Sequence, residues 1–290
     1  MATDGTARSV VITGASTGIG EACALRLDTM GWRVFAGVRK EADAQRLKAE
    51  ASERLMPLIL DVTEQPQIDA AARTVADAVG EAALGGLVNN AGIVIGGPLE
   101  FVPVEDLRRQ LEVNTIGQIA VIQAFLPLLR KARGRIINMT SIGGRFTTPF
   151  LGPYAASKHA LEALSDALRQ ELRPWKIHVA VVEPGNIATP LWEKGLRDAD
   201  EMEQKAPEEA IMLYGKSIGA VRDATRKFAA SAIPADRVAR AVAHALTSGR
   251  PRTRYIVGLD ATMVRLLDDL LPDRVMDAVA ARFLGLPSKP

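Results

Sequence analysis

Short apolar runs recur along the whole chain, and longer segments with apolar residues at helical spacing separate them. The runs that we interpret as strands cover residues 10–13, 32–38, 56–60, 86–89, 135–139, 178–182 and 254–257. Continuous apolar runs are typical of strands that are buried on both faces. Because helices alternate with these strands and hairpin turn signals are missing, the connections have to be crossovers. The chain therefore predicts an α/β fold, with a doubly wound parallel sheet of about seven strands and helices on both faces.

Composition narrows the classes of protein further. The 290 residues are 48% hydrophobic and 24% charged, with a formal net charge of +2. These values exclude a disordered chain and give no reason to expect a nucleic-acid partner. The single cysteine, Cys23, excludes an intrachain disulfide, and three scattered histidines do not suggest a metal site. Residues 1–8 do not resemble a signal peptide and no uninterrupted run of about 18 apolar residues occurs, so we expect a cytoplasmic protein without a membrane span.

A glycine-rich turn joins the first predicted strand to the first predicted helix. Glycines in such a turn let the chain reverse sharply, let backbone approach a pyrophosphate and let the helix pack close to the strand. The free N–H groups at the helix N-terminus then face the phosphates. Strand and helix flank the turn in the required order, so it predicts a dinucleotide-binding (Rossmann) fold. The residues that we expect to bind the cofactor here are Gly14, Ser16, Thr17, Gly18, Ile19 and Gly20.

Two other motifs suggest different chemistry. Residues 14–18 also fit G-x-S-x-G, the nucleophile elbow of α/β hydrolases, with Ser16 as the nucleophile. His244 would complete that triad, but it lies in an alanine-rich helical pattern, so we do not favour a hydrolase. Residues 215–217, Gly-Lys-Ser, resemble the end of a P-loop. No strand precedes them and Ala210 occupies the required glycine position, so we reject a P-loop.

The end of the second strand bears on the type of cofactor. A carboxylate there would bond the ribose hydroxyls of NAD and repel a 2′-phosphate. This chain has Arg39 and Lys40 instead, and arginine pairs with phosphate through a fork of donors. We therefore expect NADP(H). NAD(H) stays the alternative, because Glu41 and Asp43 follow shortly after and the basic pair could form a solvated turn.

A tyrosine and a lysine, Tyr154 and Lys158, would lie on one face of a helix about 6 Å apart along its axis. A nearby ammonium favours tyrosinate, so we predict that Lys158 lowers the pKa of Tyr154 and makes the phenol a general acid/base. Ser141 ends the fifth strand, and Asn114 lies in the helix after the fourth. These residues fall at the carboxyl edge of the sheet or beside it, where open α/β sheets bind ligands.

In order and spacing, these elements resemble the classical short-chain dehydrogenase/reductase family. The resemblance rests on T-G-x-x-x-G-x-G, N-N-A-G, a helix asparagine, a serine, Y-x-x-x-K and P-G, and it covers about residues 9–190. It implies a catalytic tetrad in which Ser141 polarises the substrate carbonyl and Tyr154 passes the proton. Lys158 would hold the nicotinamide ribose and tune Tyr154, and Asn114 would bind a water in the proton relay.

The resemblance also implies contacts beyond the tetrad. The cofactor would meet Tyr154 and Lys158, and further Asp61, Val62, Asn90, Ala91, Gly92, Pro184, Gly185, Ile187 and Thr189. The substrate would meet Ser141, Tyr154, Phe146 and Trp192. Many NADP-using members carry a cation inside the glycine turn, where this chain has Ser16 and Thr17. The expectation of NADP(H) therefore rests mostly on Arg39.

Several stretches, among them residues 37–39, 98–100 and 142–145, are similar to the branch near the retinol and hydroxysteroid dehydrogenases. We therefore expect an NADP(H)-dependent oxidoreductase that interconverts a small apolar secondary alcohol and its ketone. The alternatives are an NAD-dependent alcohol dehydrogenase of the same family and a non-catalytic dinucleotide sensor. Members of the family are commonly oligomers, so a homodimer or homotetramer is expected, built on the long helices near residues 104–130 and 155–171.

The domain organisation follows from the same pattern. Residues 1–260 would form one dinucleotide-binding catalytic domain, with 190–234 inserted as a substrate lid. Residues 261–290 would be a helical extension, because Val264, Leu267, Leu270 and Leu271 recur at helical spacing. We expect that helix to dock on its own domain, and the alternatives are a lid, a dimer contact or a helix on a membrane surface.

Overall fold

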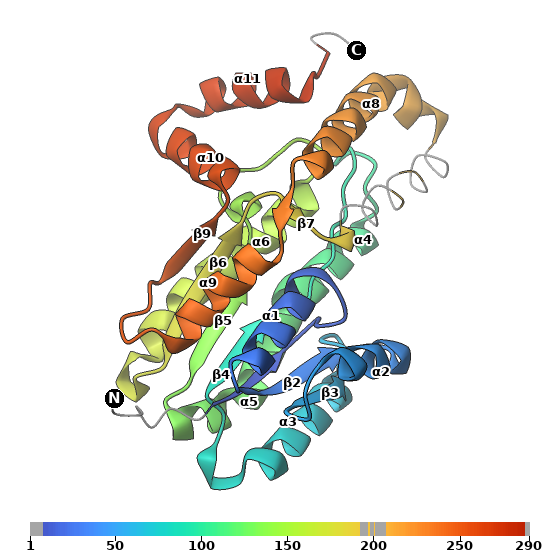
Figure 1. The fold of residues 1–290 in the computed structure, drawn as a ribbon. Helices are drawn as coiled ribbons and strands as arrows, with labels where there is room; N and C mark the ends of the chain where they lie inside the picture. The colour runs from blue at the N-terminus through green and yellow to red at the C-terminus, as the bar shows by residue number, and fades with distance from the viewer. Residues whose placement is uncertain (1–7, 192–196, 198–199, 201–206, 288–290) are drawn as a thin grey trace.

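Seven strands pair in the order β3-β2-β1-β4-β5-β6-β9, and every pair is parallel (Figure 1). The computed structural model describes residues 8–191, 197, 200 and 207–287. The strands are β1 (Ser9–Ile12), β2 (Arg33–Val38), β3 (Leu55–Ile59), β4 (Gly86–Asn89), β5 (Arg135–Met139), β6 (His178–Pro184) and β9 (Arg254–Val257). The predicted doubly wound fold is confirmed, and each predicted strand lies within two residues of the observed one.

Side chains of the central strands alternate between two apolar cores, one on each face of the sheet. Val10 and Ile12 of β1 belong to the core that packs on the first face, and Val11 belongs to the core on the second. The helices of the first face are α1 (Gly18–Thr29), α2 (Glu41–Glu50) and α9 (Asp236–Thr247). Those of the second are α3 (Gln65–Val79), α5 (Gly117–Ala132) and α6 (Gly152–Glu171). Burial on both faces explains why the strands are continuous apolar runs.

The order of the strands has a switch point between β1 and β4. From β1 the chain proceeds outward through β2 and β3, and it then returns to β4 on the other side of β1. The loops that follow β1 and β4 therefore diverge at the carboxyl edge, between adjacent strands. Ligands of open α/β sheets bind at this switch point.

The helix predicted over residues 104–130 is interrupted. α4 (Val104–Leu111) passes into a π-helical turn, η2 (Glu112–Ile116), before α5 begins. Single π-helical turns occur frequently at functional sites. Among the described residues, Val104–Ala132 is the one segment whose length and composition would allow a membrane crossing. Its residues Val121, Phe125 and Leu129 are buried in the second core, which is the packing of a core helix.

Beyond the carboxyl edge lie the elements of the predicted lid region. α8 (Glu208–Ala230) follows the residues outside the described part of the chain, and β8 (Ile233–Pro234) pairs in parallel with β7 (Ile187–Ala188). Sequence analysis predicts no strand in this region, because two residues are too short to show a period. Residue Trp192, a predicted substrate contact, lies outside the described residues. A lid function for this region stays a prediction.

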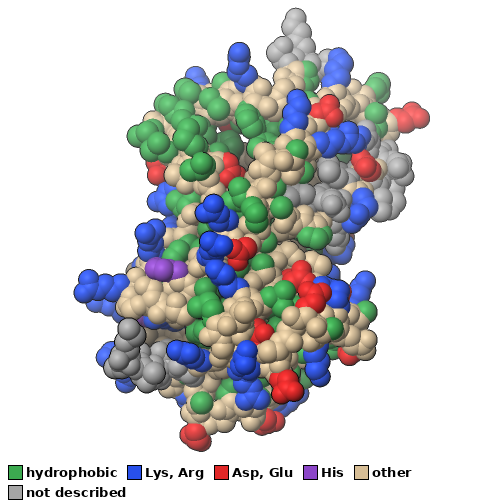
Figure 2. Space-filling view, viewed as in Figure 1, with side chains coloured by type: hydrophobic (Ala, Val, Ile, Leu, Met, Phe, Trp, Pro, Cys, Tyr) green, Lys and Arg blue, Asp and Glu red, His purple; other side chains and the backbone are tan. Residues whose placement is uncertain are grey.

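The extension contains two helices where one was expected. α10 (Leu259–Leu270) and α11 (Asp273–Leu284) are separated at Pro272. Proline has no backbone N–H to donate to the preceding helical turn, so a helix does not continue through it easily. Apolar side chains gather on the surface over these two helices, at the upper left of Figure 2. Those that are exposed are Leu259, Met263, Leu266, Leu270, Val275, Val279 and Phe283. Oligomerisation and a use of this surface as a lid, a dimer contact or a membrane-surface helix stay predictions.

Candidate active site

The glycine turn after β1 has the conformation that only glycine adopts easily. Gly14 and Gly18 have φ values of +63° and +62°, in the left-handed region that disfavours other residues. A Cβ on Gly14 would lie 2.7 Å from the Cα of Ala91, and one on Gly20 would overlap the carbonyl oxygen of Gly14. The turn therefore lies directly against the loop after β4. Glycines in such a turn also let backbone come close to a dinucleotide pyrophosphate.

Thr13 and Asn90 fasten the two loops to each other. The Thr13 hydroxyl accepts hydrogen bonds from the backbone N–H of Asn90 (2.9 Å) and of Ala91 (3.0 Å). In return, Nδ2 of Asn90 donates to the carbonyls of Thr13 (3.1 Å) and Gly14 (2.9 Å). This reciprocal pair fixes the floor of the predicted cofactor site. Ala91 and Gly92 continue along it, and a Cβ on Gly92 would lie 3.8 Å from Nζ of Lys158.

Three amide side chains hold the segment that follows. Gln110 accepts from the N–H of Ile95 (2.7 Å) and donates to the carbonyl of Ile93 (2.9 Å). Asn114 accepts from the N–H of Ile93 (2.9 Å) and donates to its carbonyl (3.0 Å) and to the Ser157 hydroxyl (3.1 Å). Gln118 donates to the carbonyl of Ala91 (2.8 Å). We call Gln110, Asn114 and Gln118 the amide ladder.

Sequence analysis singles out Asn114 but misses its two neighbours in the amide ladder. The signal is present in the sequence, because amide residues recur every four positions on one helical segment. All three side chains are buried, and buried amides are expected to have hydrogen-bond partners. The side chain of Asn114 thus holds backbone at the site.

The structure brings Ser141, Tyr154 and Lys158 together. Ser141 caps the short helix η3 (Ile142–Gly144), where its hydroxyl accepts from the N–H of Gly143 (3.1 Å). Ser141 also forms a hydrogen bond with the side chain of Tyr154. Nζ of Lys158 lies 5.8 Å from the centre of the Tyr154 ring and donates to the carbonyl of Met139 at 2.8 Å. The serine and the tyrosine thus present their hydroxyls side by side beside a buried ammonium.

The pKa of Tyr154 departs from the sequence prediction. Lys158 was expected to lower it, but burial is the larger effect and raises it, while the hydrogen bond from Ser141 acts in the opposite direction. The prediction is wrong because the sequence does not show how deeply the phenol is enclosed. Burial also lowers the pKa of Lys158 to about 8, and the charge of Glu162 partly offsets that effect. At neutral pH the tyrosine therefore holds its proton and the lysine is largely charged.

The predicted cofactor contacts Arg39, Asp61 and Val62 lie just beyond the ends of β2 and β3. Arg39 is 62% exposed on its side chain, and Nη1 lies 4.0 Å from the Asp61 carboxylate. Asp61 also accepts hydrogen bonds from the backbone N–H and the hydroxyl of Thr63 (3.0 and 2.8 Å). Val62 is buried beside α5. Arg46 of α2, which sequence analysis misses, donates to the carbonyl of Ser16 in the glycine turn.

The segment after β6 closes over the glycine turn. Pro184 ends β6, and Gly185 packs against the Asp260 carboxylate so closely that a Cβ would overlap it. Ile187 is buried in the first core. A Cβ on Gly18 would lie 3.0 Å from Cγ2 of Thr189. The structure therefore places Thr189 against the start of α1, across the predicted pyrophosphate position.

Aromatic residues from three segments meet on the substrate side. Tyr214 of α8 makes edge-on contacts with Phe101 and Phe150, with ring centres 5.9 and 6.2 Å apart. Its hydroxyl donates to Glu100 at 2.7 Å. Phe146, the other predicted substrate contact, is half-buried just after η3. Sequence analysis misses Tyr214, since its partners lie more than sixty residues away along the chain and only folding brings them together.

The alternative motifs find no support in the geometry. Nδ1 of His244 lies 2.9 Å from the hydroxyl of Tyr255, so its bond is to a tyrosine rather than to Ser16. Residues 215–217 lie inside α8, where no phosphate-binding loop can form. Within the described part of the chain, no group of three or more His, Cys, Asp or Glu residues could hold a metal ion.

A parallel sheet with a glycine turn, a tight second loop and a Ser–Tyr–Lys cluster at one edge defines a dinucleotide-dependent oxidoreductase site. The family model for short chain dehydrogenases matches residues 8–200. This chain belongs to the short-chain dehydrogenase/reductase family, whose members act on CH–OH and C=O groups, as the sequence resemblance predicts.

Curated relatives extend that match over nearly the whole chain. The NADPH-dependent 3-dehydrocapnine reductase of Ornithobacterium rhinotracheale is 34% identical, covering 94% of this chain and 95% of the relative. Retinol dehydrogenase 5 of Mus musculus is 38% identical (97% and 90% covered). The 17-beta-hydroxysteroid dehydrogenase type 6 of Bos taurus is 39% identical (97% and 90% covered). The predicted position near the retinol and hydroxysteroid branch is confirmed.

We predict that Gly14→Ala abolishes tight cofactor binding. The added Cβ meets the backbone of Ala91 and also takes an unfavourable φ. NADPH affinity, measured by fluorescence titration, should fall at least tenfold, which is about 1.4 kcal/mol. Gly31→Ala is the matched control, because Gly31 has a φ of +81° and nothing within 4 Å of an added Cβ. Equal affinity losses in the two variants would contradict the role in cofactor binding that is assigned to Gly14.

Burial of Lys158 predicts a specific pH dependence of stability. Its pKa in the folded protein is about 8, below the ordinary lysine value, so the unfolded chain binds more protons between roughly pH 8 and 10.5. The free energy of unfolding of the cofactor-free protein should therefore rise with pH in this window relative to Lys158→Met, by about 3 kcal/mol at most. Denaturant unfolding of both proteins from pH 7 to 11 measures the difference, and a flat difference would contradict it.

Proposed function

We propose that this protein is an NADP(H)-dependent oxidoreductase that interconverts a small apolar secondary alcohol and its ketone. The observation that carries the proposal is the hydrogen bond between Ser141 and Tyr154 beside the buried Lys158, at the edge where the glycine turn begins α1. Two adjacent hydroxyls can both reach one carbonyl oxygen. This is the arrangement that carbonyl reduction with a general acid requires.

Ser141 and Tyr154 have different roles at the carbonyl oxygen of the substrate. When bound, the nicotinamide supplies or accepts the hydride at the carbonyl carbon. Ser141 donates a hydrogen bond to the carbonyl oxygen and polarises it, and Tyr154 gives that oxygen its proton in reduction or takes it in oxidation. The raised pKa of Tyr154 keeps the phenol protonated near neutral pH, which suits the direction of reduction.

Lys158 and Asn114 support this proton transfer. The Lys158 ammonium, close to the Tyr154 ring, stabilises negative charge on the phenol oxygen and can hold the hydroxyls of the cofactor ribose. Both hydrogens of the Asn114 amide nitrogen are used, on Ile93 and Ser157. A relay water at Asn114 would therefore meet its main chain, within the π-helical turn.

Support for an apolar substrate comes from two sides. The aromatic contact joins Phe101, which precedes α4, Phe150, which lies between η3 and α6, and Tyr214 of α8. Two of the relatives described above are named for retinol and for hydroxysteroids, which are lipophilic alcohols. We propose a substrate of this class, a steroid-like, retinoid-like or other lipophilic carbonyl, for this chain.

Tyr154→Phe tests the acid role. The substitution keeps the ring and removes the proton, so turnover of a lipophilic ketone with NADPH should fall by about 10²–10⁴. NADPH affinity should stay within about twofold. Tyr255→Phe is the control. It removes a tyrosine hydroxyl on β9 that bonds His244 and the backbone N–H of Arg252 and is not part of the proposed active site. Near-full activity of Tyr154→Phe would refute the role. Tight cofactor binding without turnover by the wild type would favour a non-catalytic sensor.

Arg39 is the residue through which we propose that NADP(H) is preferred over NAD(H). Its guanidinium is exposed and its carboxylate partner is 4.0 Å away, so it is available to a 2′-phosphate. Arg39→Ala should weaken NADPH binding about tenfold and leave NADH binding unchanged. Arg73→Ala, an exposed arginine on α3, should change neither affinity. An unaltered NADPH affinity in Arg39→Ala would assign the preference to another residue.

A further inference from the structure

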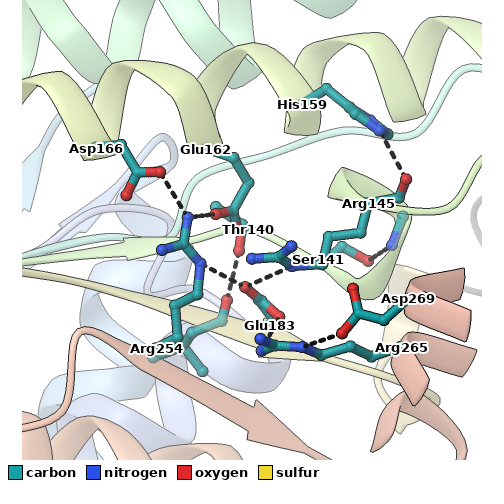
Figure 3. A network of polar contacts seen from close by, with 12 residues as sticks. Thr140, Ser141, Arg145, His159, Glu162, Asp166, Glu183, Arg254, Arg265 and Asp269 are labelled. Atoms are coloured by element: carbon teal, nitrogen blue, oxygen red, sulfur yellow. Dashed lines mark hydrogen bonds and ion pairs between the residues drawn. The ribbon is translucent and has the colours of Figure 1, made fainter. Parts of the chain in front are cut away.

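A fully buried carboxylate, Glu183, lies directly behind the proposed active site. It is the next-to-last residue of β6 and is 0% exposed. Three arginines from three different elements surround it: Arg145 after η3 at 3.2 Å, Arg254 of β9 at 3.2 Å and Arg265 of α10 at 3.9 Å. Figure 3 shows these side chains converging between helix α6 and the end of the sheet. We call Glu183 and its three arginines the Glu183 cluster.

Other carboxylates complete the charges around this cluster. Arg254 also pairs with Glu162 and Asp166 of α6, at 2.9 Å each. Arg265 pairs with Asp269, one turn along α10, at 3.6 Å. The cations of the cluster therefore meet carboxylates on more than one side, and charges in such an environment persist only when paired.

Two residues in contact within the cluster, Arg145 and Glu162, lie near residues of the proposed reaction. Arg145 follows Ser141 by four residues, on the loop that Ser141 caps. Glu162 lies one turn after Lys158 in α6, and it forms a hydrogen bond with Thr140, the neighbour of Ser141. Glu183 itself precedes Pro184 and Gly185. The cluster thus joins the backbone segments that carry the serine, the lysine and the predicted cofactor contacts Pro184 and Gly185.

α10 holds the same segment through a second contact. The Asp260 carboxylate accepts a hydrogen bond from the backbone N–H of Asn186 at 2.6 Å, and it fills the space beside Gly185. α10 therefore contacts residues 183–186 at two points: Arg265 pairs with Glu183, and Asp260 accepts a hydrogen bond from Asn186. This helix lies beyond residue 200, where the family match ends.

Stability alone is a poor explanation for such a cluster. Buried ion pairs carry a large desolvation cost, and replacing them by packed apolar residues is often neutral or stabilising. What a charged cluster adds is one defined arrangement of the elements that contribute to it. Catalysis depends on such an arrangement, because a misplacement of about 1 Å can cost on the order of 10²-fold in rate.

We propose that Glu183 and Arg265 are positioning residues, through which helix α10 fixes the Ser141 loop in its reactive geometry. The inference rests on the proposed oxidoreductase function and deepens it. It makes the extension a working part of the active site. The residues act through Arg145 and the backbone at 183–186 and do not touch the reacting atoms.

Arg265→Met removes the link from α10 and keeps most of the apolar stem. With a lipophilic ketone that the wild type reduces, we expect turnover to fall about fivefold to twentyfold while the KM for NADPH changes less than about twofold. Arg265→Lys, which keeps the charge, should restore most of the turnover. Arg274→Met, which changes an exposed arginine on α11, is the matched control and should leave turnover unchanged. Unchanged turnover in folded Arg265→Met would overturn the proposal.

A double-mutant cycle separates positioning from a general loss of stability. Arg145 and Arg265 both pair with Glu183, so the turnover losses of Arg145→Met and Arg265→Met should be strongly non-additive if they act through it. Additive losses would overturn the shared role of Glu183. Glu183→Gln removes the carboxylate that the three arginines share, and this can lower the stability of the fold. Its turnover is therefore compared only together with a measured midpoint of unfolding.

Hydrogen exchange keeps the test independent of the proposed function. Backbone amides of residues 142–146 should exchange faster in Arg265→Met than in wild type and in Arg274→Met, in the presence and absence of NADPH. Unchanged exchange would overturn the link from α10 to the Ser141 loop, whatever the activity. If the wild type reduces no ketone, the proposed function fails, while the exchange experiment still decides whether α10 holds this loop.

Discussion

The site depends on one constraint, which is that backbone polar groups next to buried parallel strands need partners away from bulk water. The strands end at a common edge, and the loops that leave them contain no regular pairing of their own. Side chains supply the missing bonds. Thr13 binds the N–H groups of the loop after β4, Asn114 binds both polar groups of Ile93, and Lys158 binds the carbonyl of Met139. Asn114 and Lys158, which are assigned to catalysis, thus also complete the hydrogen bonding of the backbone.

This double use explains the electrostatics of the site. Lys158 is enclosed because its ammonium reaches a carbonyl at the end of β5, and burial lowers its pKa. Tyr154 is enclosed by the same loops, and burial raises its pKa. The ordinary pKa values of the two groups are nearly equal, so the two shifts move them apart, with the pKa of Lys158 below that of Tyr154. Transfer of a proton from the ammonium to a phenolate is therefore favourable. Tyr154 can therefore give its proton to the substrate, and the ammonium of Lys158 can supply the proton that restores the phenol.

Much of the fold and part of the site could be predicted from the sequence. The strands were predictable because burial on both faces produces continuous apolar runs, and Ser141, Tyr154 and Lys158 were predictable because their spacing is local to one strand end and one helix. The pKa of Tyr154 could not be predicted, because it depends on how loops that are distant in the sequence enclose the phenol. The ion pairs of Arg254 and Arg265 could not be predicted either, because their partner Glu183 lies more than seventy residues away along the chain.

Transfer of a labelled hydride would test the central claim most directly. The protein is incubated with NADPH that carries deuterium on the transferable position of the nicotinamide, together with a lipophilic ketone such as a ketosteroid, and the product is analysed by mass spectrometry. The account predicts one deuterium on the carbinol carbon of the alcohol, and slower transfer from deuterated NADH. Tight binding of NADPH with no deuterium in any product across a broad panel of ketones would contradict it.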